Sequence, residues 1–197
     1  MQPGLDLKRV ETCRTNLPYR ELVGSLLFLA RTTRPDISYA VSKLAQYCNG
    51  HDLEHWKAAK EVLRYLKGTM TTGIRYEKQD SIELYSYTDF DYAGDRQDRK
   101  STTGFAFFIN NQIISWCSQK QDIVSLSSTE AEYIALAAGA KECMWLRKFL
   151  GELGVEQETP TKIFVDNTSA IRLAENPEFH KRSKHIDVRF HFTRFRF

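Results

Sequence analysis

Two aspartates in separate parts of the chain have positions suited to ligand chemistry. Asp89 ends an apolar stretch that is expected to form a strand, and Asp166 ends a later stretch of the same kind. The carboxyl ends of strands in an open α/β sheet border the crevice where ligands bind, so both carboxylates are expected at one sheet edge. An ordinary turn aspartate is the alternative interpretation of either residue taken singly.

Glu132 lies on the apolar stripe of a long predicted helix. Steps of three and four residues along that helix give the rest of the stripe: Ala135, Leu136, Gly139, Cys143, Leu146 and Leu150. Glu130 falls on a more mixed face and fits a capping box that begins at Ser127. A carboxylate directed at a core is costly unless it is paired or binds a cation. Glu132, not Glu130, is therefore the predicted third acid of the site.

Three inward carboxylates near one edge repel one another, and a divalent cation is the usual remedy. Magnesium suits such a site, with manganese as an alternative, because it takes hard oxygen ligands and bridges carboxylates to phosphates. The four cysteines form no C-x-x-C pair and have no histidine at zinc-finger spacing. Two magnesium ions can stabilise the attacking and leaving oxygens of a phosphoryl displacement. The implied chemistry is phosphodiester hydrolysis.

The elements that position these acids follow a helical part of the chain. Helices are predicted from Pro18, over 37–47 with Asp36 as its cap, and over 54–67. The later elements are strands at 82–89, 104–109, 113–117 and 162–165, a helix at 128–150, and a short helix ended by Pro177. Strands followed by alternating helix and strand predict an α/β fold, a mixed sheet with flanking helices after a small helical module.

Composition narrows the class of protein further. The 197 residues are 42% hydrophobic, which is enough to bury a core, and the net charge of +3 indicates no particular partner. No secretory signal opens the chain, and the apolar run at 26–30 is too short to span a bilayer. An intracellular protein, cytoplasmic or nuclear and without a membrane partner, is expected.

The later motifs resemble the ribonuclease H domain of copia-type retrotransposon Pol polyproteins. They are YTDFDYAGD at 87–95 with RKSTTG at 99–104, LSSTEAEY at 126–133, VDNTSAI at 165–171 and KHID at 184–187. The segments YRELVGSL at 19–26, RPDISYAV at 34–41 and AKEVLRYLKG at 59–68 resemble the connection between the reverse transcriptase and that domain. The resemblance implies an N-terminal tail at 1–16, a helical connection segment at 17–78, and a ribonuclease H-like domain at 79–197.

The same resemblance implies roles for the acids. Asp89, Glu132 and Asp166 would be the catalytic, metal-binding residues, and their order separates the chain from integrases, which place the glutamate last. A fourth acid normally follows a final strand that is expected beyond Phe197. Asp187 is a weak additional candidate, with a helix cap or a salt bridge as its alternative role.

The expected function is magnesium-dependent cleavage of RNA in RNA/DNA hybrids, with an upstream reverse-transcriptase module in an intact polyprotein. The missing fourth ligand leaves an alternative open. This alternative is an incomplete retroelement relic that binds nucleic acid or a protein partner, or that has no selected function.

Contacts to nucleic acid are predicted from one basic run. Lys181, Arg182, Lys184 and His185 form a cluster of the kind that phosphate backbones attract, and a solvated helix entrance is the alternative. The tryptophans give no comparable signal. Trp56, Trp116 and Trp145 fall within apolar patterns, so core packing is favoured over stacking on bases.

Overall fold

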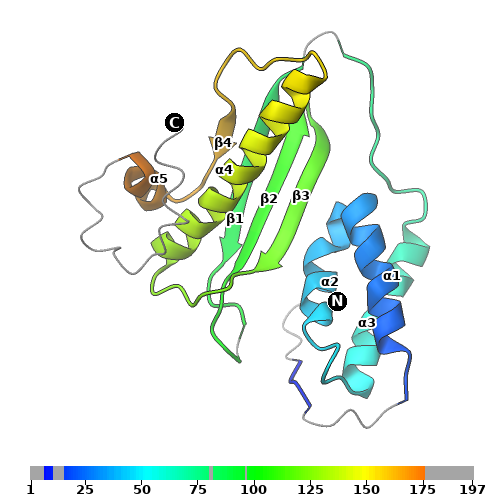
Figure 1. Ribbon diagram of the computed structural model, residues 1–197. Helices are drawn as coiled ribbons and strands as arrows, with labels where there is room; N and C mark the ends of the chain where they lie inside the picture. The colour runs from blue at the N-terminus through cyan, green and yellow to red at the C-terminus, as the bar shows by residue number, and fades with distance from the viewer. Residues whose placement is uncertain (1–6, 11–15, 80–81, 96, 176–197) are drawn as a thin grey trace. The chain divides into compact units, whose positions relative to one another are not determined.

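The computed structural model of the chain describes residues 7–10, 16–79, 82–95 and 97–175. The chain divides into two units, residues 1–75 and residues 76–197 (Figure 1). No helix among the described residues is long and apolar enough to cross a membrane.

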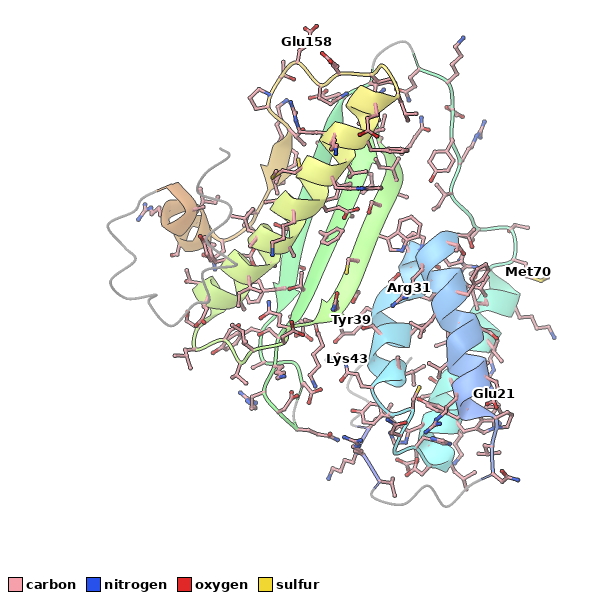
Figure 2. All side chains as sticks on the ribbon, in the orientation of Figure 1. Glu21, Arg31, Tyr39, Lys43, Met70 and Glu158 are labelled. Atoms are coloured by element: carbon pink, nitrogen blue, oxygen red, sulfur yellow. The ribbon has the colours of Figure 1, made fainter. Side chains whose placement is uncertain are left out.

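The first unit is helical. Its elements are α1 (Tyr19–Thr32), the short 3-10 helix η1 (Pro35–Ile37), α2 (Ser38–Ala45) and α3 (Leu53–Gly68). Apolar residues at helical spacing, among them Val23, Leu26, Val41, Leu44 and Val62, are buried together as its core. Glu21 and Arg31, labelled in Figure 2, lie on the exposed side of α1. This amphipathic pattern is why these segments fold as packed helices.

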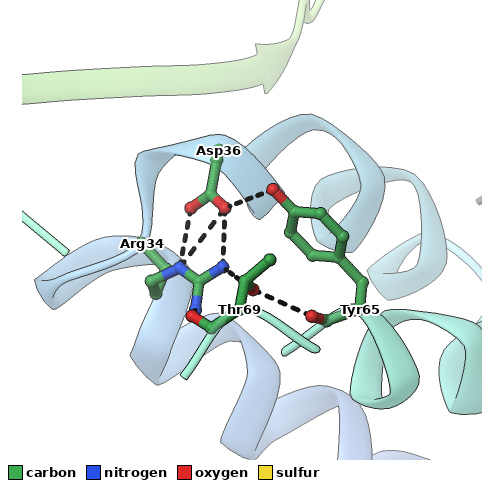
Figure 3. Close-up of polar contacts among 4 residues, drawn as sticks. All are labelled: Arg34, Asp36, Tyr65 and Thr69. Atoms are coloured by element: carbon green, nitrogen blue, oxygen red, sulfur yellow. Dashed lines mark hydrogen bonds and ion pairs between the residues drawn. The ribbon is translucent and has the colours of Figure 1, made fainter. Parts of the chain in front are cut away.

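A polar cluster joins the corner before α2 to the end of α3 (Figure 3). The Asp36 carboxylate accepts hydrogen bonds from Arg34 Nε at 2.9 Å and Nη2 at 2.7 Å, and from the Tyr65 hydroxyl at 2.9 Å. Arg34 Nη2 also donates to Thr69 Oγ1 at 2.7 Å. The prediction that Asp36 caps the second helix is wrong, because Ile37 is the N-cap and no side chain caps it. A charged guanidinium outcompetes a neutral backbone N–H for the carboxylate.

The second unit is a four-stranded sheet with helices. Its elements are β1 (Leu84–Asp91), β2 (Thr102–Ile109), β3 (Gln112–Lys120), α4 (Ser128–Glu152), β4 (Lys162–Phe164) and α5 (Thr168–Glu175). The strand order is β3-β2-β1-β4, with β1, β2 and β3 antiparallel in sequence and β4 parallel to β1. Figure 1 shows α4 lying along one face of this sheet. This is a mixed α/β architecture of the ribonuclease H-like kind, as predicted.

Local sequence explains the hairpin between β2 and β3. Asn110 and Asn111 join β2 to β3 with φ angles of 48° and 69°, a left-handed conformation that asparagine tolerates in tight hairpin turns. The predicted hairpin is confirmed.

The core beneath α4 contains Leu84 and Phe107 of the sheet and Leu146 of the helix.

The expectation that Trp145 packs in the core is wrong. Trp145 is 56% exposed and stacks on Phe149, with ring centroids 5.5 Å apart. It precedes the buried Leu146 by one residue, so it is rotated about 100° from the buried stripe of the helix. Trp56 is partly buried against the core of the first unit, and Trp116 is half-buried.

Replacing Asp36 tests the polar cluster of the first unit. Asp36→Ala leaves the buried Arg34 guanidinium without its carboxylate, so we expect the unit to lose about 2 kcal/mol of stability at pH 7. Hydrogen exchange of the α1–α3 amides in the full chain measures this loss. Tyr65→Phe removes one hydrogen bond to the same carboxylate and should cost about 1 kcal/mol.

The loss should also depend on pH. The hydrogen bond from Arg34 holds the pKa of Asp36 below its ordinary value. The stability that this carboxylate contributes is therefore present above its ordinary pKa and is lost as the pH falls through the lowered one. The difference between wild type and Asp36→Ala should shrink in acid. An unchanged difference would contradict the assignment.

Candidate metal centre

Three carboxylates converge in the second unit. Asp89, Glu132 and Asp166 each offer one oxygen, and these oxygens all lie within 4.8 Å of one another. Asp89 belongs to β1, Glu132 to α4, and Asp166 follows β4 by two residues. Asp89 and Asp166 are exposed and Glu132 is buried. Within the described part of the chain, no other group of three His, Cys, Asp or Glu side chains converges in this way.

The parallel pairing of β1 with β4 places the two aspartates together. Tyr85 pairs with Lys162 and Tyr87 pairs with Phe164. The same register carried two residues further sets Asp89 beside Asp166. Neighbouring strands lie about 4.8 Å apart, so side chains at paired positions on one face can approach each other. The strand register therefore brings residues 77 positions apart in the sequence to one place.

Local hydrogen bonds fix the backbone around both aspartates. The amide of Phe90 donates to Asp89 Oδ1 at 2.7 Å. Directly after Asp166, the Asn167 side chain accepts hydrogen bonds from the amides of Ser169 at 2.9 Å and Ala170 at 3.2 Å. Asn167 is thus the cap of α5, which packs against α4. These local bonds hold the two aspartates where the strand register places them.

The start of α4 positions Glu132. Ser127 is the N-cap, and its hydroxyl accepts a hydrogen bond from the Glu130 amide at 3.1 Å. The Glu130 carboxylate in turn accepts from the Leu126 amide at 2.8 Å, so Glu130 is the predicted first-turn acid, and its bond is to the residue before the N-cap. The predicted stripe that begins at Glu132 is also buried throughout. The predicted contrast with Glu130 does not hold, because Glu130 is only 4% exposed and is buried as well. The two glutamates differ in their contacts: the Glu130 carboxylate accepts a hydrogen bond from the Leu126 amide, and Glu132 lies with the two aspartates of the cluster.

Glu132 is an unusually unfavourable carboxylate. Its side chain is 0% exposed, and neither oxygen has a hydrogen-bond partner among the described residues. Burial, together with the charges of Asp166 and Asp89, raises its pKa to about 7. A bound cation would relieve both the desolvation and the repulsion. Three carboxylates and no sulfur or imidazole form the oxygen donor set that magnesium and manganese prefer.

Other acids of the same sequence motif have structural roles that the sequence did not reveal. Lys120 Nζ contacts Asp95 and lies 2.9 Å from Asp98, which pins the loop between β1 and β2 to the end of β3. Asp95 also accepts a hydrogen bond from the Gln97 amide at 2.8 Å. These pairings account for two of the acids near Asp89. The sequence alone does not show that Lys120 pairs with these acids, because the pairing of β2 with β3 is what brings it close to them.

The remaining residues of the predicted site lie outside the described residues. They are the weak additional ligand candidate Asp187 and the basic residues Lys181, Arg182, Lys184 and His185. Their roles stay predictions.

Comparison with known proteins gives relatives over most of the chain. The retrovirus-related Pol polyprotein from transposon RE2 of Arabidopsis thaliana is 46% identical over 184 residues, 91% of this chain and 13% of that protein. The corresponding polyprotein from transposon TNT 1-94 of Nicotiana tabacum is 46% identical over 178 residues, 90% of this chain and 13% of that protein. The secreted RxLR effector protein 161 of Plasmopara viticola is 44% identical over 131 residues, 66% of this chain and 92% of that protein. No family model and no solved structure matches the chain.

The fold and the carboxylate cluster define a ribonuclease H-like α/β protein with a candidate metal centre. Over about nine tenths of its length, the chain is similar to retrovirus-related Pol polyproteins from transposons. It spans about an eighth of the length of the two polyproteins described above.

The raised pKa of Glu132 predicts a pH-dependent loss of stability in the metal-free chain. A carboxyl whose pKa is raised by folding stabilises the fold below its ordinary pKa of 4.5, and this contribution is lost as the pH rises to about 7. The expected loss is about 3 kcal/mol. Glu132→Gln carries no charge, so it should be more stable than wild type at pH 8 and nearly equal to it at pH 4.5. Thermal denaturation in EDTA measures both differences.

Glu158→Gln is the matched control for this experiment, because Glu158 is an exposed carboxylate between α4 and β4 (Figure 2). It should follow the wild-type profile at both pH values. If the stability of Glu132→Gln changed with pH as that of wild type does, ionisation of Glu132 would not be the cause of the loss of stability.

Proposed function

We propose that this chain carries a ribonuclease H-like endonuclease domain that hydrolyses the RNA strand of RNA/DNA hybrids. The observation that carries the proposal is the convergence of three carboxylates around Glu132, which is fully buried and has no hydrogen-bond partner among the described residues. An arrangement that costs folding energy in this way is expected at a functional site. The relationship to Pol polyproteins supports the same proposal.

Asp89, Glu132 and Asp166 would hold divalent magnesium, with manganese as the alternative. When bound, two such ions would stabilise negative charge on the attacking and leaving oxygens of the phosphodiester. The exposed Asp89 and Asp166 carboxylates face solvent and are accessible to substrate phosphate, whereas Glu132 supports the site from within the fold. Because the pKa of Glu132 is about 7, its carboxyl must lose a proton to serve as a ligand. Metal binding should therefore strengthen as the pH rises through 7.

The proposed substrate is read by shape more than by base sequence. Contacts to phosphates and to RNA 2′-hydroxyls distinguish a hybrid from duplex DNA without base-specific bonds. The basic residues Lys181, Arg182, Lys184 and His185 would supply phosphate contacts. In an intact polyprotein, the partner of this domain would be an upstream reverse-transcriptase module that delivers the hybrid.

Cleavage of a labelled RNA/DNA hybrid tests the function. We expect the full chain to cut the RNA strand in magnesium and to lose this activity in EDTA. Asp89→Asn, Glu132→Gln and Asp166→Asn should each slow cleavage by at least about 100-fold, because losing one metal ligand removes several kcal/mol of charge stabilisation. Gel analysis under single-turnover conditions measures the rates.

Glu158→Gln should retain the wild-type rate, since this exposed acid lies outside the cluster. Equal cleavage by wild type and all three cluster variants would assign the activity to a contaminant. If the wild-type chain bound the hybrid without cleaving it, the result would favour a retroelement relic that retains the fold and has lost catalytic activity.

A further inference from the structure

Gly139 is an unexpected residue in the interior of a long helix. It lies within the run ALAAGA at 135–140 of α4, where its neighbours are mostly alanine. Glycine is among the least favourable residues in a helix interior because it loses the most backbone freedom on folding, and alanine is the most favourable. A buried glycine in an alanine-rich run therefore calls for a packing reason.

The packing reason is a close approach to Thr88 of β1. A Cβ atom placed on Gly139 would lie 2.6 Å from Thr88 Cγ2, well inside the normal contact distance between carbon atoms. Thr88 is buried, and two of the three staggered positions on its Cβ carry heavy atoms, so its side chain has few ways to yield. Gly151 of the same helix differs, because a Cβ there would meet nothing within 4 Å.

This contact joins the two elements that carry metal ligands. Gly139 follows Glu132 by seven residues, which is about two turns, so both residues face the same side of α4 at a separation of about 10 Å. Thr88 directly precedes Asp89 on β1. The distance between α4 and β1 at the glycine therefore determines how far the Glu132 carboxylate reaches toward Asp89.

We propose that Gly139 and Thr88 are positioning residues for the metal centre. Because glycine has no Cβ, α4 can pack closely enough against β1 for the Glu132 carboxylate to lie within 4.8 Å of those of Asp89 and Asp166. An added methyl group would force the helix outward by about 1 Å, because close-packed interiors transmit such strain to their neighbours. This inference rests on the proposed metal site. A substitution at Gly139 leaves the three carboxylates of that site chemically unchanged.

Manganese binding to the full chain, followed by electron paramagnetic resonance, tests the inference. Gly139→Ala should bind Mn²⁺ about 10-fold more weakly or worse, the range found when residues that support metal ligands are lost. Gly151→Ala makes the same chemical change in the same helix without a clash, and it should bind as wild type does. A wild-type chain that binds no Mn²⁺ would overturn the metal site itself, and the positioning role with it.

A second substitution separates the specific contact from general damage. Thr88→Ser removes the clashing methyl, so the pair Gly139→Ala with Thr88→Ser should recover wild-type affinity. Thr88→Val retains two heavy γ atoms and should give no recovery in the same background. If Gly139→Ala alone does not fold, the inference requires that the double variant, Gly139→Ala with Thr88→Ser, folds and also binds Mn²⁺. Wild-type affinity in Gly139→Ala, or no recovery with Thr88→Ser while wild type binds, would overturn the inference.

Discussion

The desolvated carboxylate of Glu132 is the constraint on which the second unit depends. Burial without a hydrogen-bond partner among the described residues opposes its ionisation, and the charges of Asp166 and Asp89 oppose it further. A fold selected for stability alone would place an apolar residue here, as it does at the neighbouring Ala131 and Tyr133. The surrounding core supplies the stability that this carboxylate removes. The proposed metal site would account for a carboxylate at this position.

Helix caps and strand pairing together hold the Glu132 carboxylate and the two aspartates in place. The Ser127 and Glu130 caps fix where α4 begins, and the pairing of β1 with β4 fixes the two aspartates relative to each other. The Asn167 cap turns the chain from β4 into α5 immediately after Asp166. No single one of these contacts is sufficient, because the three carboxylates come from separate elements. Their spacing depends on how closely the helix approaches the strand.

The sequence was sufficient to predict those parts of the site that depend on local rules. The period of α4 predicts the burial of Glu132, although not that of Glu130, and the apolar runs before Asp89 and Asp166 locate both strands. Long-range packing was less accessible. The partner of Asp36 comes from a competition between a guanidinium and the backbone, and the exposure of Trp145 depends on which helix faces are covered. The closeness of Gly139 to Thr88 appears only when helix and strand are packed together.

The fold moves the pKa of Asp36 and Asp95 in one direction and that of Glu132 in the other. Hydrogen bonds from Arg34 lower the pKa of Asp36. Burial opposes ionisation of Asp95, yet its bond to Lys120 outweighs this and the pKa is again lowered. Both acids therefore stabilise the fold as carboxylates. The pKa of Glu132 is raised, because burial opposes its ionisation and because its charged neighbours are acids, where the other two have a cation. Among these partly or fully buried acids, a raised pKa without a basic partner is the property that marks Glu132 as the candidate for a functional carboxylate.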